Sequence, residues 1–264
     1  MDPATEAGYL SRNDGCPFCQ QVVAGAPQMT EERPMDMITD PPILKIKRNF
    51  QRPAPEIVAA LTGASTGHLV DAMGGSGALD WHIKPLDAAM PGFCGVAITC
   101  DAGPADNLAV FAALDAAKPG DVIVAATGGH LAAAVIGDLV VGMARNCGAA
   151  AIVTEGTVRD AVGIMAVGLP VYCVGVSPNS PVRNGPGTVG LPIVVGGVAV
   201  DAGDILVGDG DGVVVVPRQI AATVVAKLVD VRKAEVALEA KVKAGLRMPD
   251  FVESLLNSSR VEEL

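Results

Sequence analysis

An arginine and an aspartate stand side by side at positions 159 and 160, shortly after the apolar run AAAIV. That run is typical of a buried strand, and ligands of α/β folds collect beyond the carboxyl ends of parallel strands. The Arg159 guanidinium offers a planar set of donors to a carboxylate or keto oxygen. The Asp160 carboxylate offers a hard oxygen ligand to Mg²⁺ or Mn²⁺. The pair therefore predicts a site for an anionic ligand and a divalent cation, although a surface ion pair has the same pattern.

A second candidate element lies upstream, where Gly128, Gly129 and Gly137 surround the expected start of a helix at Asp138. Backbone N–H groups at a helix N-terminus bind anions, helped by a dipole equivalent to about half a positive charge. Gly137 has no side chain and lets a ligand come close. The alternative is that the glycine serves packing and that Asp138 caps the helix. His130, just ahead of this element, is a candidate substrate contact.

The expected last helix, residues 218–245, carries Glu235 where its apolar repeat requires an apolar residue. The apolar positions around it are Val224, Leu228, Val231, Leu238 and Val242. A carboxylate on a buried face is costly unless it is paired or bound to a metal. Two interpretations stay open. Either the stripe ends and Glu235 is solvated, or its carboxylate reaches a site, including one in a neighbouring subunit.

Three other motifs indicate chemistry less strongly. CPFC at residues 16–19 has zinc-like spacing, but no second Cys or His pair lies nearby to complete four ligands. GDGDG at 208–212 resembles the start of a calcium loop but lacks its later Glu, so a hairpin turn is favoured. Lys84 lies near an expected cleft edge, which leaves a Schiff-base role open. The three histidines are too dispersed to predict a metal site.

Composition argues against several classes of protein. Lys and Arg total 19 against 29 Asp and Glu, and the net charge of -10 disfavours nucleic-acid binding, which needs a basic face. The apolar stretch at residues 122–137 has no Asp, Glu, Lys or Arg, but it is shorter than the roughly 20 residues of a membrane span. The N-terminus has no apolar segment typical of a secretory signal. We therefore expect a cytoplasmic protein with no membrane partner, whose thiols are free.

Strands and helices alternate through the middle of the chain, which implies parallel strands and right-handed crossovers. Residues 1–52 lack periodicity and are expected to be an N-terminal extension, whereas residues 53–264 form one domain. Helices are expected at 53–63, 65–75, 106–121, 136–148, 161–168 and 218–245, and strands at 93–103, 121–126, 149–156, 170–176 and within 205–217. The apolar stripe of the fourth helix is expected to be Ile136, Leu139, Val140, Met143 and Cys147. The fold class is α/β with β/β/α layers, like a swivelling domain, a central mostly parallel sheet and a long C-terminal helix.

The runs PGDVIVAATGG, IGDLVVGMARNCGAAAIVTEGTVRD, GLPVY and VGGVAVDAGDILVGDGDGVVVVP resemble the RraA-like family, over residues 55–246. That family includes the 4-hydroxy-4-methyl-2-oxoglutarate and 4-carboxy-4-hydroxy-2-oxoadipate aldolases and the regulator of ribonuclease E activity. The resemblance implies a metal-dependent (class II) pyruvate aldolase that cleaves a 4-hydroxy-2-oxo acid, with oxaloacetate decarboxylation as a side activity. It also implies Mg²⁺, Mn²⁺ or another divalent cation and a homotrimer or homohexamer. The alternatives are a non-enzymatic regulator of the ribonuclease E inhibitor type and a lysine-based aldolase.

The resemblance also assigns residues. The amides that hold the substrate carboxylate fall on Gly137, Asp138, Leu139 and Val140. Arg159 would bind the 2-oxo acid, Asp160 would ligate the metal, and Glu235 matches a glutamate that acts through water from the adjoining subunit. Two positions depart from the usual family pattern, since Glu155 stands where Asp is common and Asp138 where Glu is common. These departures leave the identity of the substrate open.

Overall fold

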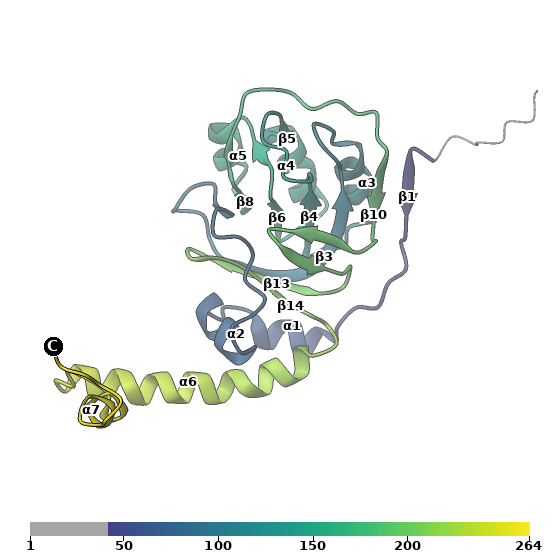
Figure 1. Ribbon diagram of the computed structural model, residues 1–264. Coiled ribbons are helices and arrows are strands. Elements are labelled where there is room, and N and C mark those ends of the chain that lie inside the picture. Colours follow the sequence, from purple (N-terminus) through teal and green to yellow (C-terminus); the bar gives the residue numbers. More distant parts are fainter. Residues whose placement is uncertain (1–41) are drawn as a thin grey trace, which may run out of the picture. The chain divides into compact units, whose positions relative to one another are not determined.

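The computed structural model describes residues 42–264, which belong to one compact unit with a mostly parallel sheet at its centre (Figure 1). The CPFC motif with Cys16 and Cys19 lies outside the described residues. No helix within the described part of the chain is long and apolar enough to cross a membrane. The mixed α/β fold with its long C-terminal helix confirms the predicted fold class.

Four parallel strands form the middle of the sheet, in the order β3-β4-β6-β8. Their bounds are Phe93–Asp101, Asp121–Ala126, Ala151–Thr154 and Val171–Cys173. The sheet continues through β10 (Gly187–Val189) and β1 (Leu44–Ile46) at one edge and β2 (Lys84–Pro85) at the other. The central strands are almost wholly buried, as expected where both faces of a parallel sheet are covered.

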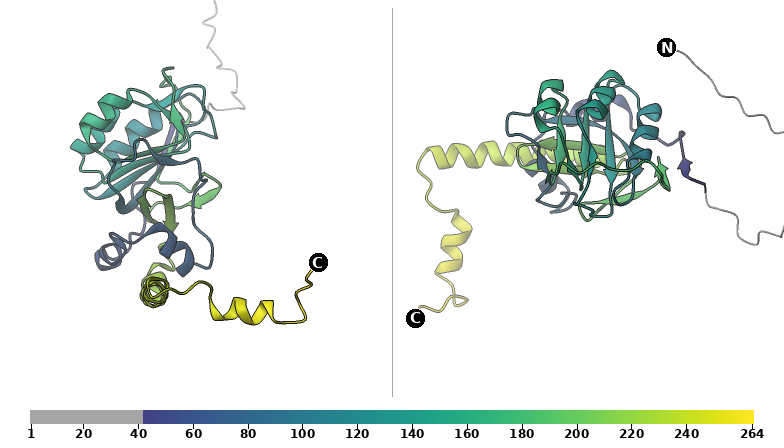
Figure 2. Two further views of the ribbon diagram at one scale, coloured as in Figure 1. Left: turned by 90° about the vertical axis from the view of Figure 1, so that its left-hand side faces the viewer. Right: turned by 90° about the horizontal axis from the view of Figure 1, so that it is seen from above.

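Three helices cover one face of this sheet, as Figure 2 shows. They are α3 (Leu108–Ala116), α4 (Asp138–Asn146) and α5 (Ala161–Val167). Because side chains alternate along a strand, every second residue, such as Ile98, Ile123 or Ile152, packs beneath these helices in one core.

The opposite face carries further β-structure and then a second layer of helices. The strands are β11 (Ile193–Val195), β12 (Val198–Val200), β13 (Ile205–Asp209) and β14 (Gly212–Val216). Intervening strand residues such as Val122 and Val124 pack against them. Beyond β13 and β14 lie α1 (Pro55–Leu61), α2 (Thr66–Ala72) and α6 (Ala221–Lys243), which close a third core (Figure 1). The β13–β14 hairpin confirms that GDGDG is a turn.

A small parallel sheet of three short strands lies past the carboxyl ends of the main strands. These are β5 (Ala134–Ile136), β7 (Thr157–Val158) and β9 (Gly175–Val176), in the order β5-β7-β9. Each follows a main strand in the chain: β5 comes after β4, β7 after β6 and β9 after β8. The sequence did not predict β5 and β7, because two or three residues are too few to show a periodic pattern, and it merged β8 and β9 into one expected strand at 170–176.

The structure corrects details of the predicted elements. Ile136 belongs to β5 and not to the following helix, whose buried residues are Val140, Val141 and Ala144. Leu139 and Met143, expected in the core, are 74% and 44% exposed. The physical reason is that both side chains line a pocket at the start of α4.

The structure adds two elements at the ends of the unit. Part of the expected N-terminal extension joins the body, since β1 pairs with β10 and Arg52 binds the nearly buried Asp121 at 2.6 and 2.8 Å. A further short helix, α7 (Asp250–Leu256), follows α6 and was not predicted. Along α6, burial is confined to its first part, so the apolar stripe ends before Glu235.

Candidate functional site

The two sequence elements predicted to form a site come together because their strands are neighbours. Strands β5 and β7 are parallel and pair Ile136 with Val158, so the next residues, Gly137 and Arg159, leave the same edge together. The Arg159 N–H donates to the Ile136 carbonyl at 3.0 Å, which extends the pairing by one residue. Figure 1 shows β5, α4 and α5 gathered at this end of the sheet.

Gly137 is placed where no larger residue fits. A Cβ atom at this position would lie 2.6 Å from Asp160 Oδ2 and 3.1 Å from Arg159 Cγ. The backbone of Gly137 is extended, with φ −136°, so the requirement for glycine comes from close approach and not from backbone strain. Gly137, the N-cap residue of α4, thus packs directly against the side chains of Arg159 and Asp160.

The Arg159 and Asp160 side chains form an ion pair at the surface of this pocket. Arg159 Nε lies 3.2 Å from Asp160 Oδ2, and the side chains are 36% and 45% exposed. The guanidinium also donates to the Ser180 hydroxyl, from the loop after β9. Both groups are therefore oriented by the protein and remain accessible to a small ligand.

Asp160 has an unusual backbone conformation. Its φ of 59° and ψ of 42° lie in the left-handed region, and it is the N-cap residue of α5. Its carbonyl accepts the Ile164 N–H at 2.9 Å, the first bond of that helix. A non-glycine residue in this region is unfavourable by about 1–2 kcal/mol, and such residues gather at functional sites. The conformation turns the chain sharply between β7 and α5.

The start of α4 is only partly free to bind an anion. The Leu139 N–H, one of the predicted carboxylate donors, already donates to Asp138 Oδ1 at 2.7 Å. The Asp138 carboxylate also lies against α5, where a Cβ atom on Gly163 would be 2.5 Å from Oδ2. A substrate carboxylate can use the Leu139 N–H only when the Asp138 side chain turns away.

These groups line a pocket of about 150 Å³, the Arg159 pocket, whose other wall comes from α3 and from the loop after β9. Arg183, in that loop, stacks over the Phe111 ring, with 5.4 Å from its guanidinium carbon to the ring centroid. No carboxylate within residues 42–264 forms an ion pair with it. The pocket thus holds a second arginine whose charge is available to a ligand.

Asn107, just before α3, supplies the pocket with a buried acceptor. Its Nδ2 donates to the Val135 carbonyl at 3.1 Å, while its Oδ1 has no hydrogen-bond partner among residues 42–264. The residue is only 2% exposed, and a buried acceptor without a partner is unfavourable. A hydroxyl or water in the pocket would satisfy it. Sequence reasoning missed Asn107 and Arg183, although the loop that carries Arg183 is rich in Pro, Gly and Asn.

The metal-binding side chains of one chain supply only part of the ligand shell of a divalent cation. Among the described residues no group of three or more His, Cys, Asp or Glu side chains could hold a metal ion. Mg²⁺, however, is commonly held by one or two carboxylates while waters and substrate oxygens complete its shell. The accessible carboxylate of Asp160 meets that requirement, and the remaining oxygens would come from water and ligand.

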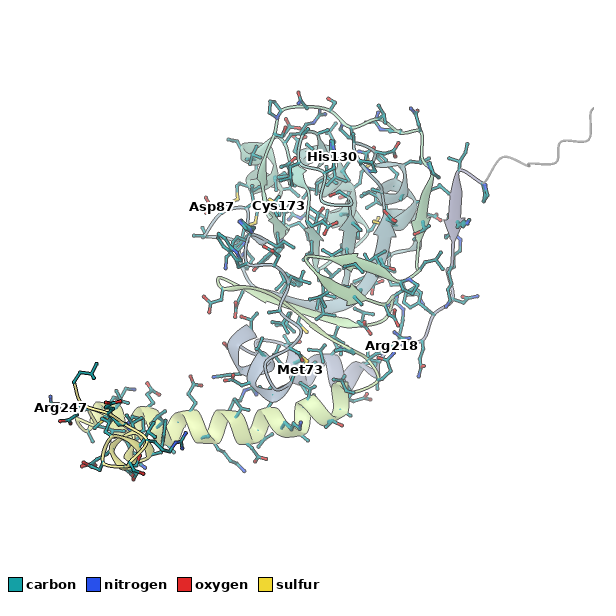
Figure 3. The ribbon with its side chains drawn as sticks, viewed as in Figure 1. Met73, Asp87, His130, Cys173, Arg218 and Arg247 are labelled. Carbon is teal, nitrogen blue, oxygen red and sulfur yellow. The ribbon has the colours of Figure 1, made fainter. Side chains whose placement is uncertain are left out.

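The other predicted residues lie elsewhere. The Glu235 carboxylate contacts the His68 ring, and this contact joins α6 to α2 within one chain. The expected role of Glu235 at the site of a neighbouring subunit stays a prediction. His130 is not among the residues that line the pocket, although Figure 3 shows it among the loops at the same end of the sheet, far from Met73, which follows α2. Gly129 donates to Glu155 in a separate loop contact, and the Lys84 amine donates to the Asp211 carbonyl.

A family model and several known proteins relate the chain to one family. The family model described as "RraA-like: Aldolase/RraA" matches residues 66–215. A Halalkalibacterium halodurans protein named "Putative 4-hydroxy-4-methyl-2-oxoglutarate aldolase" is 40% identical over 148 residues, which are 56% of this chain and 70% of that protein. Streptomyces coelicolor RraAS2, described as an unusual member of the RNase ES inhibitor RraA family, superposes with a TM-score of 0.64 at 28% identity, covering 72% of this chain and all of that one. The RNA-processing inhibitor RraA from Thermus thermophilis gives 0.53 at 30% identity, over 58% of this chain and 93% of that one.

Proposed function

The chain belongs to the RraA-like family, and from this premise we propose that it is a divalent-metal-dependent pyruvate aldolase acting on a 4-hydroxy-2-oxo acid. The observation that carries the proposal is the convergence of Arg159, Asp160 and the α4 start at one small pocket. This pocket combines a fixed guanidinium, an accessible carboxylate and backbone N–H donors. Those are the groups that a 2-oxo acid and a hard cation require.

The proposed reaction breaks the bond between C3 and C4 of the substrate. The 4-hydroxyl loses its proton and becomes the carbonyl of the leaving product, while the bonding electrons move onto the pyruvate unit as its enolate. Protonation at C3 then gives pyruvate. In this proposal Arg159 stabilises the developing negative charge, and a preorganised donor of that kind typically contributes on the order of 10² to 10³ in turnover.

Asp160 is the residue of this chain that would hold the divalent cation. When bound, the cation would supply Lewis-acid stabilisation of the developing negative oxygen. Asp160 also keeps Arg159 in position through their ion pair. Loss of CO₂ from oxaloacetate produces the same enolate, so the same groups support a decarboxylase side activity.

Two further residues suit the far end of a 4-hydroxy-2-oxo acid. The unpaired acceptor of Asn107 fits a substrate hydroxyl, since a hydroxyl can donate to it. Arg183 fits a second carboxylate, which favours dicarboxylic over monocarboxylic substrates. Both residues line the same pocket as Arg159.

The experiment measures pyruvate release by the full chain from oxaloacetate and from 4-hydroxy-4-methyl-2-oxoglutarate, with Mg²⁺ and with excess EDTA. We expect activity that EDTA abolishes and Mg²⁺ restores. Arg159→Ala and Asp160→Ala should each lower kcat by about 10² or more. Arg48→Ala and Asp115→Ala are matched controls, because these residues form an exposed ion pair away from the pocket. Wild-type turnover in the Asp160 variant would overturn the proposal.

A second candidate function is a non-enzymatic regulator, favoured by the similarity to the two RraA inhibitor structures. It predicts no pyruvate release from any 4-hydroxy-2-oxo acid, with or without metal. A lysine-based aldolase would instead be trapped by borohydride and be indifferent to EDTA. The bond from Lys84 to the Asp211 carbonyl holds that amine at the β13–β14 turn, outside the pocket, which disfavours this third possibility.

We also propose that the chain forms a homotrimer or homohexamer. Leu139 and Val162, next to the Arg159 pocket, are 74% and 86% exposed, and apolar residues of this kind suit a subunit interface. Light scattering coupled to size-exclusion chromatography tests this. A monomer at micromolar concentration would contradict it.

A further inference from the structure

A second and larger cavity lies at the carboxyl ends of the main strands. It measures about 430 Å³, and its walls include Gly129, Glu155 and Val174, the residues that follow β4, β6 and β8. The turn of the β11–β12 hairpin, Gly196 and Gly197, forms another wall. It shares no lining residue with the Arg159 pocket. Ligands of α/β proteins collect at this edge of a sheet, and the proposed aldolase reaction does not use this cavity.

An oriented histidine stands at the cavity wall. His82 Nδ1 lies 2.7 Å from Asp80 Oδ1, and the His82 backbone N–H donates to the same oxygen at 2.8 Å. A carboxylate can only accept, so Nδ1 is the donor, and in the corresponding tautomer Nε2 is left as an acceptor. The two bonds from His82 also lower the pKa of the Asp80 carboxyl, which keeps it charged.

Glu155 is a second fixed carboxylate in the same cavity. It accepts the N–H groups of Thr127 at 3.3 Å, Gly129 at 3.2 Å and Gly196 at 3.0 Å. These donors come from the loop after β4 and from the β11–β12 turn, so the carboxylate is held before any ligand arrives. An ionised carboxylate has about four acceptor positions, which leaves one for a ligand.

The charged side chains of this cavity differ from those of the Arg159 pocket, where two arginines stand beside Asp138 and Asp160. Two carboxylates, Asp80 and Glu155, face it, and no Lys or Arg lines it. Its apolar walls, Ile83, Leu131 and Val174, accommodate a hydrocarbon body. Apolar side chains of this kind do not ligate a metal ion, so the cavity suits an organic cation with a hydrocarbon part.

We propose that this cavity binds a small organic ammonium ion, a primary amine with a compact apolar body. The ammonium group donates to Glu155 and to His82 Nε2, and the hydrocarbon part lies against Leu131 and Val174. The site is independent of the aldolase chemistry. A free amine is the intended ligand, and a lysine side chain of another protein carries the same chemical group.

The chain contains its own reporter for this site. Trp81 is the only tryptophan, and its ring stacks on His82 with centroids 3.6 Å apart. The experiment follows Trp81 fluorescence of the full chain at pH 7.5 and constant ionic strength during addition of cyclohexylmethylamine. Cyclohexylmethanol and cyclohexanecarboxylate are the neutral and anionic probes of the same shape, and Nα-acetyl-lysine amide represents a protein side chain.

We expect saturable binding of the amine, at least tenfold tighter than that of the alcohol, the carboxylate or the lysine derivative. Asp80→Asn should weaken amine binding at least fivefold, and Leu131→Phe, which fills the cavity from a half-exposed position, should abolish it. Asp115→Asn is the matched control and should bind as wild type. A linear or equal response to all probes, unchanged affinity in both variants, or tighter binding of the lysine derivative would overturn the proposal. Pyruvate release by Asp80→Asn should equal wild type, so failure of the amine site is distinguishable from failure of the aldolase assignment.

Discussion

Asp160 Oδ2 stands so close to Gly137 that a single methyl group on that glycine would come within 2.6 Å of it. Gly137→Ala should therefore displace the Asp160 carboxylate and the neighbouring Arg159 stem. A displacement of about 1 Å at a reacting group can lower the rate about 10²-fold. We expect kcat/KM for oxaloacetate to fall by about that factor, measured by pyruvate release, while circular dichroism shows an intact fold.

Gly142→Ala is the matched control for this substitution. Gly142 lies within α4, and a Cβ atom there would meet nothing within 4 Å. Alanine in a helix interior is more favourable than glycine by about 0.5–1 kcal/mol. This variant should unfold at a slightly higher temperature and retain full activity. Equal activity of the two variants would show that contact with Gly137 does not position the Arg-Asp pair.

Arg183 should discriminate between substrates by their second carboxylate. A hydrogen bond to a charged group contributes about 1.5–3 kcal/mol, so Arg183→Ala should lower kcat/KM for 4-hydroxy-4-methyl-2-oxoglutarate about 10- to 100-fold. The monocarboxylic 4-hydroxy-2-oxopentanoate lacks the group that Arg183 would bind and should be affected less than threefold. Equal losses with both substrates would contradict this role and indicate a general effect on the pocket.

The main fold was predictable because its elements are long and regular. The strands β3 and β4 are mostly apolar segments of nine and six residues, and α3 and α4 follow them between clear glycine and proline signals. The small sheet was not predictable, since β7 and β9 have two residues each. Its consequence, the adjacency of Gly137 and Arg159, is a long-range pairing that no local pattern encodes.

Apolar periodicity failed where function or exposure competes with burial. Leu139 and Met143 matched a core stripe, yet they border the Arg159 pocket, and the buried face of α4 is turned toward Val141 and Ala144. Glu235 interrupted an apolar stripe that the fold does not bury at that point. The spacing of apolar residues identifies a helix, but it does not show which face of that helix is buried against the rest of the protein.

Glu155 should be a determinant of stability, because its carboxylate accepts three backbone N–H groups from two loops. Glu155→Gln replaces one accepting oxygen by a donor, which leaves a backbone N–H without a partner at a cost of about 1–3 kcal/mol. Urea denaturation should show this loss in the free energy of unfolding. Glu239→Gln, at an exposed ion pair with Lys243, should change it by less than about 0.5 kcal/mol. A Glu155 variant as stable as that control would refute the structural role.

Two buried thiols should make the protein less stable at alkaline pH. Burial raises the pKa of Cys100 from 9.0 to about 12 and that of Cys173 to about 11. In the folded state both thiols stay neutral, whereas in the unfolded chain they ionise near pH 9. The contribution of the two thiols to the free energy of unfolding is therefore complete below pH 9. It is lost as the pH rises from 9 toward 11–12. Each unit of pH within this window lowers the free energy of unfolding by about 1.4 kcal/mol per thiol.

The test compares urea denaturation at pH 8 and pH 10 under reducing conditions. Cys100→Ala leaves a small cavity and should be less stable than wild type at pH 8, but it should lose about 1 kcal/mol less between the two pH values. Val124→Ala, a buried substitution in the neighbouring strand, creates a cavity without removing a titrating group and should keep the wild-type pH dependence. The contradicting outcome is that both variants lose the same free energy of unfolding as wild type between pH 8 and pH 10. The Cys100 thiol would then ionise in the folded protein as readily as in the unfolded chain. In that case the sheet could not exclude water from this thiol as the structure requires.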